Sequence, residues 1–374
     1  MDQDLEKAYN AIMDAVCAED LFGELIDPSG RTPRETLLAN IYGLLLTRVD
    51  PKNYAGSPDD KDLASDALIR LNQFHVRAQA RLAEGIYGMR SITAPAHRAR
   101  TLAFKTEKRE YYISEPLAEG TIATIYDGEC AMNDEFAGRT AIKIVNDAAD
   151  NECLMREARI ITALHAGNGA QRKHLPVLLD RFKTSDGRLG LIFRHIDESQ
   201  DIWTLLDRPE HQRGLDRKHM VWILNRTLSA AGYAHNLGIV HGNIEPAHLM
   251  VRGRDHNIFL IDWAWASVSP VKTGDQFKIF TEHFSAPEVK AKGQPHPASD
   301  LYSIGKCMIH LVGGDVETNT MPRSVEPKLQ RFLHYLVTES MAQRPHDAWD
   351  QWRYLRALIV ELWGKRTFLP LTTT

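Results

Sequence analysis

Along the first 90 residues, apolar side chains recur every three or four positions, and polar loops separate the runs. This spacing predicts amphipathic helices. The second of the three expected helices begins near Thr32 and ends at Asp50-Pro51, because proline cannot continue the helical hydrogen-bond ladder. The apolar positions of the first and third helices are Leu5, Ala8, Ile12, Leu63, Leu68, Leu71, Phe74, Ala78 and Leu82. Residues 1–90 are therefore predicted to form an all-α domain.

From Tyr111 the pattern changes to short runs of β-type residues bounded by turn residues. The sequence Ser185-Asp186-Gly187 between two of these runs indicates a β-hairpin. After His195 the pattern is mostly helical to residue 374. The expected fold class is thus α+β, with an all-α domain at 1–90, a linker at 91–110, a small β-rich lobe at 111–196 and a larger helical lobe at 197–374.

Composition narrows the class of protein. Of the 374 residues, 43% are hydrophobic and 25% are charged, which is typical of a globular protein. The formal net charge of −4 favours neither nucleic acid nor an anionic membrane as a partner. No apolar run approaches the length of a membrane span, and no signal peptide is recognisable. The four cysteines, Cys17, Cys130, Cys153 and Cys307, form no CxxC pair. A soluble cytoplasmic protein with reduced thiols is expected.

Eight short motifs follow one another between residues 117 and 345. In this sequence they are Leu117-Ala118-Glu119-Gly120, Ala141-Ile142-Lys143, Arg156-Glu157-Ala158, His241-Gly242-Asn243-Ile244-Glu245-Pro246-Ala247-His248, Leu260-Ile261-Asp262-Trp263, Ala286-Pro287-Glu288, Asp300-Leu301-Tyr302 and Arg344-Pro345. Each motif alone is weak evidence, but their common order and near-normal spacing are specific. Residues 111–374 therefore resemble the protein kinase family, which implies a bilobal fold.

The resemblance implies that part of an ATP site is retained. Lys143 stands where kinases hold the α- and β-phosphates, and Glu157 stands where a helix glutamate pairs with that lysine. Gly120 is the one glycine kept from the glycine-rich loop. Asp262 is a hard oxygen donor at the position that binds Mg²⁺. ATP and Mg²⁺ are thus candidate cofactors, and a protein that binds neither is the alternative.

The same resemblance implies that the catalytic loop has lost its chemistry. Asn243 replaces the aspartate that accepts the substrate proton, and a neutral amide is a poor base. Glu245 replaces a lysine near the γ-phosphate, where a carboxylate opposes the developing negative charge. His248 replaces an asparagine that binds a second Mg²⁺, for which imidazole is a poor ligand. We also expect Asp300 to accept hydrogen bonds from the loop backbone, and Glu288 to pair with Arg344.

The predicted helices on either side of Asp50-Pro51 resemble a degenerate J-domain hairpin, although the sequence Arg48-Val49-Asp50-Pro51 lacks the His-Pro-Asp motif of that family. This order of modules looks like a group of bacterial and phage-related proteins. The favoured reading is a pseudokinase that acts as a scaffold or nucleotide-binding regulator with a protein partner. The alternatives are an altered ATP-dependent phospho- or nucleotidyl-transferase and a chaperone-associated adaptor. Nucleic-acid and membrane partners are not expected.

Overall fold

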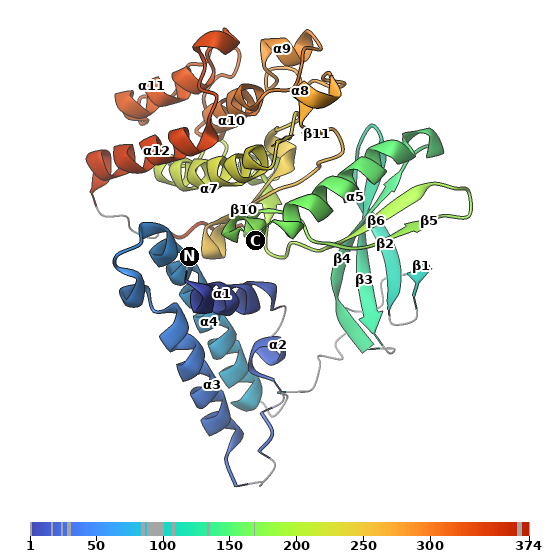
Figure 1. Cartoon of the computed structure of the whole chain (residues 1–374), viewed down its shortest axis with the longest axis vertical. Coiled ribbons are helices and arrows are strands. Elements are labelled where there is room, and N and C mark those ends of the chain that lie inside the picture. Colours follow the sequence, from blue (N-terminus) through green and yellow to red (C-terminus); the bar gives the residue numbers. More distant parts are fainter. Residues whose placement is uncertain are drawn as a thin grey trace. The chain divides into compact units, whose positions relative to one another are not determined.

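The computed structural model describes residues 2–15, 18–23, 25–27, 31–83, 87, 101–106, 109–132, 135–167, 169–364 and 369–373 (Figure 1). Cys17 and residues 91–100 of the expected linker lie outside the described residues. The chain divides into two compact units, one of residues 1–117 and 126–141 and the other of residues 118–125 and 142–374. The α+β class is confirmed, with helices ahead of a β-rich and then a helical region.

The helices of the first unit are α1 (Gln3–Asp14), α2 (Ala18–Phe22), α3 (Arg34–Val49), the 3₁₀ turn η1 (Pro51–Tyr54) and α4 (Pro58–Ala83). Both α1 and α3 pack on α4. One face of α4 supplies the core at the expected spacing, through Ala64, Ala67, Leu71, Phe74 and Ala78. Arg70 of α4 donates to the carbonyls of Ile12 and Ala15, and so satisfies backbone acceptors at the end of α1.

Local hydrogen bonds close the turn between α3 and α4. The Asp50 carboxylate accepts from the Lys52 amide at 3.0 Å. Tyr54 Oη donates to the Arg48 carbonyl at 2.7 Å. The predicted helical hairpin is confirmed, and Asp50-Pro51 ends its first helix as expected. Its likeness to a J-domain stays a prediction.

Six strands form one sheet in the order β1-β2-β3-β4-β6-β5. Their bounds are β1 (Thr101–Lys105), β2 (Glu110–Glu119), β3 (Ala123–Met132), β4 (Glu135–Val145), β5 (Leu178–Lys183) and β6 (Leu189–Arg194). Strand β1 falls in the range expected to be a linker, and it pairs with β2 so that Lys105 lies opposite Glu110. Strands β5 and β6 form the predicted hairpin around Asp186-Gly187.

The second unit continues with η2 (Ala148–Asp150), α5 (Asn151–Ala166), η3 (Ala170–His174), β7 (Gln200–Asp201), α6 (Ile202–Leu206), α7 (Arg217–Asn236), β8 (Ile239–Val240), η4 (Pro246–His248), β9 (Leu249–Arg252), η5 (Gly253–Asp255), β10 (Asn257–Leu260), β11 (Ser267–Val268), α8 (Pro270–Thr273), α9 (Pro287–Lys290), α10 (Pro297–Leu311), α11 (Pro327–Leu336), η6 (Met341–Gln343) and α12 (Ala348–Trp363). Helix α7 is the centre of the helical core, and α10 and α12 both pack on it. None of the helices that the model describes is both long and apolar enough to cross a membrane.

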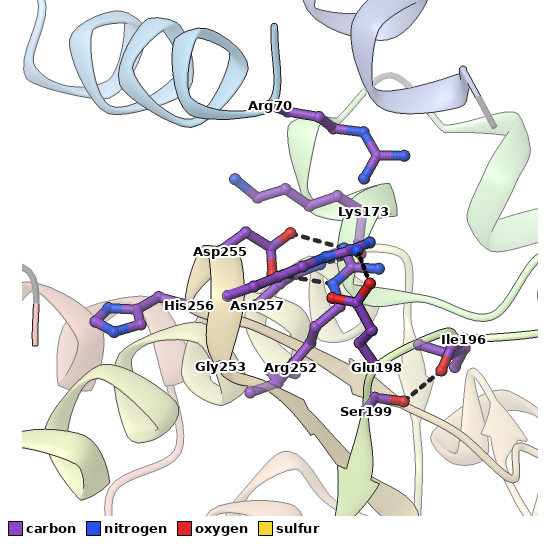
Figure 2. Close-up of polar contacts among 12 residues, drawn as sticks. Arg70, Lys173, Ile196, Glu198, Ser199, Arg252, Gly253, Asp255, His256 and Asn257 are labelled. Atoms are coloured by element: carbon purple, nitrogen blue, oxygen red, sulfur yellow. Dashed lines mark hydrogen bonds and ion pairs between the residues drawn. The ribbon is translucent and has the colours of Figure 1, made fainter. Parts of the chain in front are cut away.

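The last described residues, 369–373, pack against the turn between β9 and β10. Gly253 lies so close to them that a Cβ atom there would stand 1.9 Å from the Leu371 carbonyl oxygen. The Thr373 hydroxyl donates to the Glu198 carbonyl at 2.8 Å and accepts from the Gly253 amide at 3.2 Å. Around this turn, Arg252 binds Asp255 and Arg254 binds Glu198 (Figure 2). Glycine at 253 is therefore required by a close backbone approach.

A buried ion pair joins α9 to the segment before α12, as the sequence predicted. Arg344 Nη1 lies 2.6 Å from Glu288 Oε1, and the arginine side chain is 0% exposed. Its other donors bind the carbonyls of Thr338, Ala298 and Glu339. Burial alone would raise the pKa of Glu288, but hydrogen bonds from Arg344 and Ser299 lower it below its ordinary value. The pair therefore depends on complete hydrogen bonding in a dry environment.

We predict that Arg344→Met lowers the free energy of unfolding by about 3–5 kcal/mol, because it leaves the Glu288 carboxylate buried without its partner. The matched control is Arg353→Met, since Arg353 pairs with Asp350 where both side chains are more than 60% exposed. That control is expected to change stability little. Urea unfolding followed by circular dichroism measures both, and equal losses in the two variants would contradict the prediction.

Candidate functional site

The loop that carries Asn243, Glu245 and His248 is held from below by Asp300 of α10. Its two carboxylate oxygens accept from the backbone amides of His241 and Gly242, each at 2.8 Å. His235 of α7 lies 2.9 Å from the same carboxylate. The expectation that Asp300 braces this loop is confirmed. Two charge-assisted bonds to consecutive amides leave the loop little freedom to change its backbone path.

Lys143 of β4 connects two carboxylates from elsewhere in the second unit. Its Nζ lies 2.8 Å from Glu157 Oε2 of α5 and 2.7 Å from Asp262 Oδ1. The expected Lys143–Glu157 pair is confirmed. Burial alone would lower the pKa of Lys143, but the Asp262 and Glu157 carboxylates raise it above its ordinary value. Lys143 is therefore an ammonium ion whose charge is already balanced within the protein.

His248 supplies a second cation to Asp262. Its Nε2 lies 3.2 Å from Asp262 Oδ2 and 3.4 Å from Glu245 Oε1. Its Nδ1 lies 2.8 Å from the Asn243 carbonyl, so both ring nitrogens face acceptors. Burial alone would lower the pKa of His248, but Asp262 and then Glu245 raise it. An imidazolium that donates from both nitrogens fits this environment.

Asp262 therefore has one cation on each carboxylate oxygen. Burial would raise the pKa of this carboxyl group, but Lys143 and His248 hold it well below its ordinary value. The backbone at Asp262 is left-handed, with φ of 61°, a conformation that aspartate tolerates better than most residues. That turn aims the side chain toward Lys143 and His248.

Trp263, the residue after Asp262, is anchored in the core. The side chain is 0% exposed, and its Nε1 donates to the Leu260 carbonyl at 2.8 Å. The Trp263 backbone amide donates to Glu157 Oε1 at 3.1 Å, so Glu157 binds both Lys143 and the segment after Asp262. The indole also packs edge-on against His241, with ring centroids 4.5 Å apart. The backbone amide of residue 263 thus fixes the segment to α5, while the indole fixes it to Leu260 and His241, a role that the sequence alone did not suggest.

Asn243, at the position of the missing base, is engaged from the segment before α9. The Thr281 hydroxyl donates to Asn243 Oδ1 at 3.2 Å, and the Thr281 amide donates to the Ser285 hydroxyl at 2.8 Å. The asparagine is buried. The Asn243 amide oxygen thus has a partner within the protein. Thr281 and Ser285 lie shortly before Ala286-Pro287-Glu288, and the sequence analysis did not identify their contact with Asn243.

The turn at Gly120 is also closed by a side chain, that of Asn146 after β4. Asn146 Nδ2 donates to the carbonyl of Gly120 at 2.9 Å and to that of Thr121 at 3.4 Å. Its Oδ1 accepts from the Thr124 hydroxyl at 2.8 Å. One amide side chain therefore fastens both sides of the turn to the end of β4. Sequence reasoning missed Asn146, and its only signal was a polar residue three positions after Lys143.

These contacts do not fit a Mg²⁺ site. A divalent cation requires oxygen ligands that do not already face positively charged groups, whereas the two Asp262 oxygens face Lys143 Nζ and His248 Nε2. Among the described residues, no three His, Cys, Asp or Glu side chains are grouped to hold a metal ion. A metal at Asp262, and ATP at Gly120, Lys143 and Glu157, stay predictions from the resemblance.

Comparison with known proteins gives one consistent answer. Residues 111–361 match the model of the protein kinase domain. Over 237 residues the chain is 23% identical to serine/threonine-protein kinase pkn3 of Myxococcus xanthus, covering 60% of this chain and 41% of the relative. It is also 23% identical over 203 residues to casein kinase II subunit alpha' of Saccharomyces cerevisiae, covering 53% and 54% respectively. The chain thus spans about half, or less, of the length of these curated relatives.

We predict opposite pH dependences for two histidines of this loop. The pKa of His248 is raised, so its stabilising contribution is complete below about pH 6.5, the ordinary histidine value, and is lost as pH rises through the folded-state pKa. Thermal midpoints should therefore differ more between wild type and His248→Asn at pH 6 than at pH 9. A charged hydrogen bond of this kind contributes about 1.5–3 kcal/mol.

His241 is the matched control, because burial lowers its pKa to about 4. Its contribution to stability is present above about pH 6.5 and is lost as pH falls toward 4. The difference between wild type and His241→Gln should thus shrink on acidification, where the His248 difference grows. The same pH trend for both variants would contradict the assignment of charge.

Proposed function

Because this chain belongs to the protein kinase family, we propose that it is a pseudokinase, which acts as a scaffold or nucleotide-binding regulator and does not transfer phosphate. One observation carries the proposal. Both oxygens of Asp262 bind cations of the protein itself, Lys143 and His248. In an active kinase, lysine and aspartate positions of this kind serve the nucleotide phosphates and Mg²⁺. Here the same charges satisfy one another.

The substituted catalytic loop supports this reading. Asn243 is a weak base, and its oxygen accepts from Thr281. Glu245 brings a carboxylate within 3.4 Å of His248, which adds negative charge where a transferred phosphoryl group would need positive charge. A scaffold and a nucleotide-binding regulator differ in whether the protein responds to nucleotide. A scaffold is favoured because Lys143 Nζ and His248 Nε2 engage the two oxygens of Asp262, the residue expected to bind a metal.

An altered phospho- or nucleotidyl-transferase is the second candidate. It is favoured by the position of Lys143, which joins Glu157 and Asp262 within 2.8 Å, since positioned charge supplies most of the catalysis in phosphoryl transfer. Incubation with ATP labelled at the α- or the γ-phosphate separates the two candidates. Covalent label on protein from either nucleotide, lost in Asp262→Asn, would establish a transferase and overturn the pseudokinase proposal.

We predict that restoring the kinase residues restores metal-dependent nucleotide binding. The variant Asn243→Asp, Glu245→Lys, His248→Asn removes the internal cation from Asp262 and returns the residues that kinases carry. With ATP at about 1 mM, the upper end of common KM values, its thermal midpoint should rise only when Mg²⁺ is present. The wild-type midpoint should be unaffected by Mg²⁺.

The matched control adds Asp262→Asn to the triple variant, which should abolish the Mg²⁺-dependent rise. A wild-type protein whose midpoint already rises with Mg²⁺-ATP, and not with ATP alone, would show that His248 yields its place to a metal. That outcome would remove the observation on which the proposal rests.

A further inference from the structure

The first turn of α10 is closed by an imidazole. His296 has the extended backbone of a helix N-cap, and its Nδ1 accepts from the Ala298 amide at 3.1 Å. Serine, threonine, aspartate and asparagine are the usual side chains at this position, and none of them changes its charge near neutral pH. A backbone amide can only donate, so Nδ1 of His296 carries a lone pair and the ring is neutral in this contact. The cap therefore exists only while His296 is unprotonated.

The same turn of α10 holds two other parts of the second unit. The Ser299 hydroxyl donates to Glu288 Oε1 at 2.7 Å, and the Ala298 carbonyl accepts from Arg344 Nη1 at 3.0 Å. Asp300, the next residue, accepts from the two backbone amides through which it braces the catalytic loop. Three consecutive residues, 298–300, thus connect the cap to the Glu288–Arg344 pair and to the catalytic loop.

Titratable and charged groups from three other segments face the ring of His296. His346, before α12, packs edge-on against it with ring centroids 4.8 Å apart. Burial lowers the pKa of His296, and His346 and His235 of α7 lower it further. Glu288 of α9 acts in the opposite direction, but it is paired with Arg344, whose charge lowers the pKa again. The positive end of the α10 dipole adds to this preference for a neutral ring.

Protonation of His296 removes the cap. Nδ1 changes from acceptor to donor, so the Ala298 amide loses its partner and an imidazolium faces the positive end of the helix. Because the pKa of His296 is lowered in the folded state, the cap stabilises this turn fully above about pH 6.5, the ordinary histidine value. Its contribution is lost as the pH falls below that value. Mild acid therefore acts on the turn that carries Asp300.

We propose that His296 is a proton-sensitive cap that couples mildly acidic pH to the conformation of the catalytic loop. At neutral pH the uncharged ring closes the first turn of α10, and Asp300 holds the amides of His241 and Gly242. On acidification the ring leaves the turn, and the brace on the loop loosens. The inference goes beyond the proposed function, because it requires neither nucleotide nor a partner. It gives the loop that carries Asn243 a conformational response to protons.

Three other histidines lie near this loop, so the experiment must separate them from His296. His235 contacts Asp300 directly, His248 contacts Asp262, and burial lowers the pKa of His241 to about 4. The variant His296→Asn leaves all three in place. Asparagine is among the best N-cap residues, and its amide oxygen accepts a hydrogen bond without titrating. The difference between wild type and this variant therefore reports the proton on His296 alone.

The test is amide hydrogen exchange of the full chain without nucleotide, followed by mass spectrometry and corrected for the intrinsic effect of pH on exchange. Protection is compared from about pH 7.5 to about pH 5.5, a range that spans the ordinary histidine pKa. On acidification the peptide containing residues 298–301 should lose about twofold to thirtyfold more protection in the wild type than in His296→Asn, the range expected for loss of a helix cap. The peptide containing His241 and Gly242 should show a loss in the same direction.

The matched control is His334→Asn, at an exposed histidine of α11 that contacts the Asn319 carbonyl, and it should keep the wild-type response to pH. His296→Ser, a second cap that does not titrate, should behave like His296→Asn. Equal pH dependence in the wild type and both His296 variants would overturn the inference. A difference at residues 298–301 with none at 241–242 would overturn the coupling to the loop. Since no nucleotide is present, neither result bears on the pseudokinase proposal, and the two can fail independently.

Discussion

The carboxylate of Asp262 organises the second unit, because Lys143 and His248 each contact one of its two oxygens. Lys143 comes from β4 and His248 from the loop that Asp300 braces. Lys143 also binds Glu157, and Glu157 binds the Trp263 amide. Strand, helix and loop are thus joined through one chain of ion pairs. Removing Lys143 would leave Glu157 as a buried carboxylate without its ion-pair partner, which is why such a network holds a fixed arrangement.

These ion pairs hold the strand, helix and loop together through contacts between residues of the chain itself. Asn146 closes the Gly120 turn and Thr281 donates to the Asn243 amide oxygen, so polar groups of both loops have protein partners. Complete internal hydrogen bonding lowers the gain from binding anything else, because a ligand must first break these contacts. A kinase-like arrangement of Lys143, Glu157 and Asp262 therefore coexists in this unit with the substituted residues Asn243, Glu245 and His248.

The sequence predicted the fold and the members of the site better than it predicted their contacts. Ordered motifs identified Lys143, Glu157 and Asp262, and helical spacing identified the N-terminal helices. The partnership of His248 with Asp262, like that of Asn146 with Gly120, joins residues far apart in the chain, and no local pattern records such contacts. Strand β1 was missed because five residues in a charged region carry little periodicity, and pairing with β2 decides their conformation.

The contact between Gly253 and Leu371 limits which substitutions this sequence can accept at position 253. The kinase-domain match ends at residue 361, ten positions before the carbonyl that excludes a side chain at 253. An alignment limited to residues 111–361 would not explain the glycine at 253, because the residue that excludes a side chain there, Leu371, lies outside the alignment. Which residues are tolerated at position 253 therefore depends on the backbone position of residue 371. A larger residue at 253 would be tolerated only in a relative whose segment equivalent to residues 369–373 lies farther from this turn.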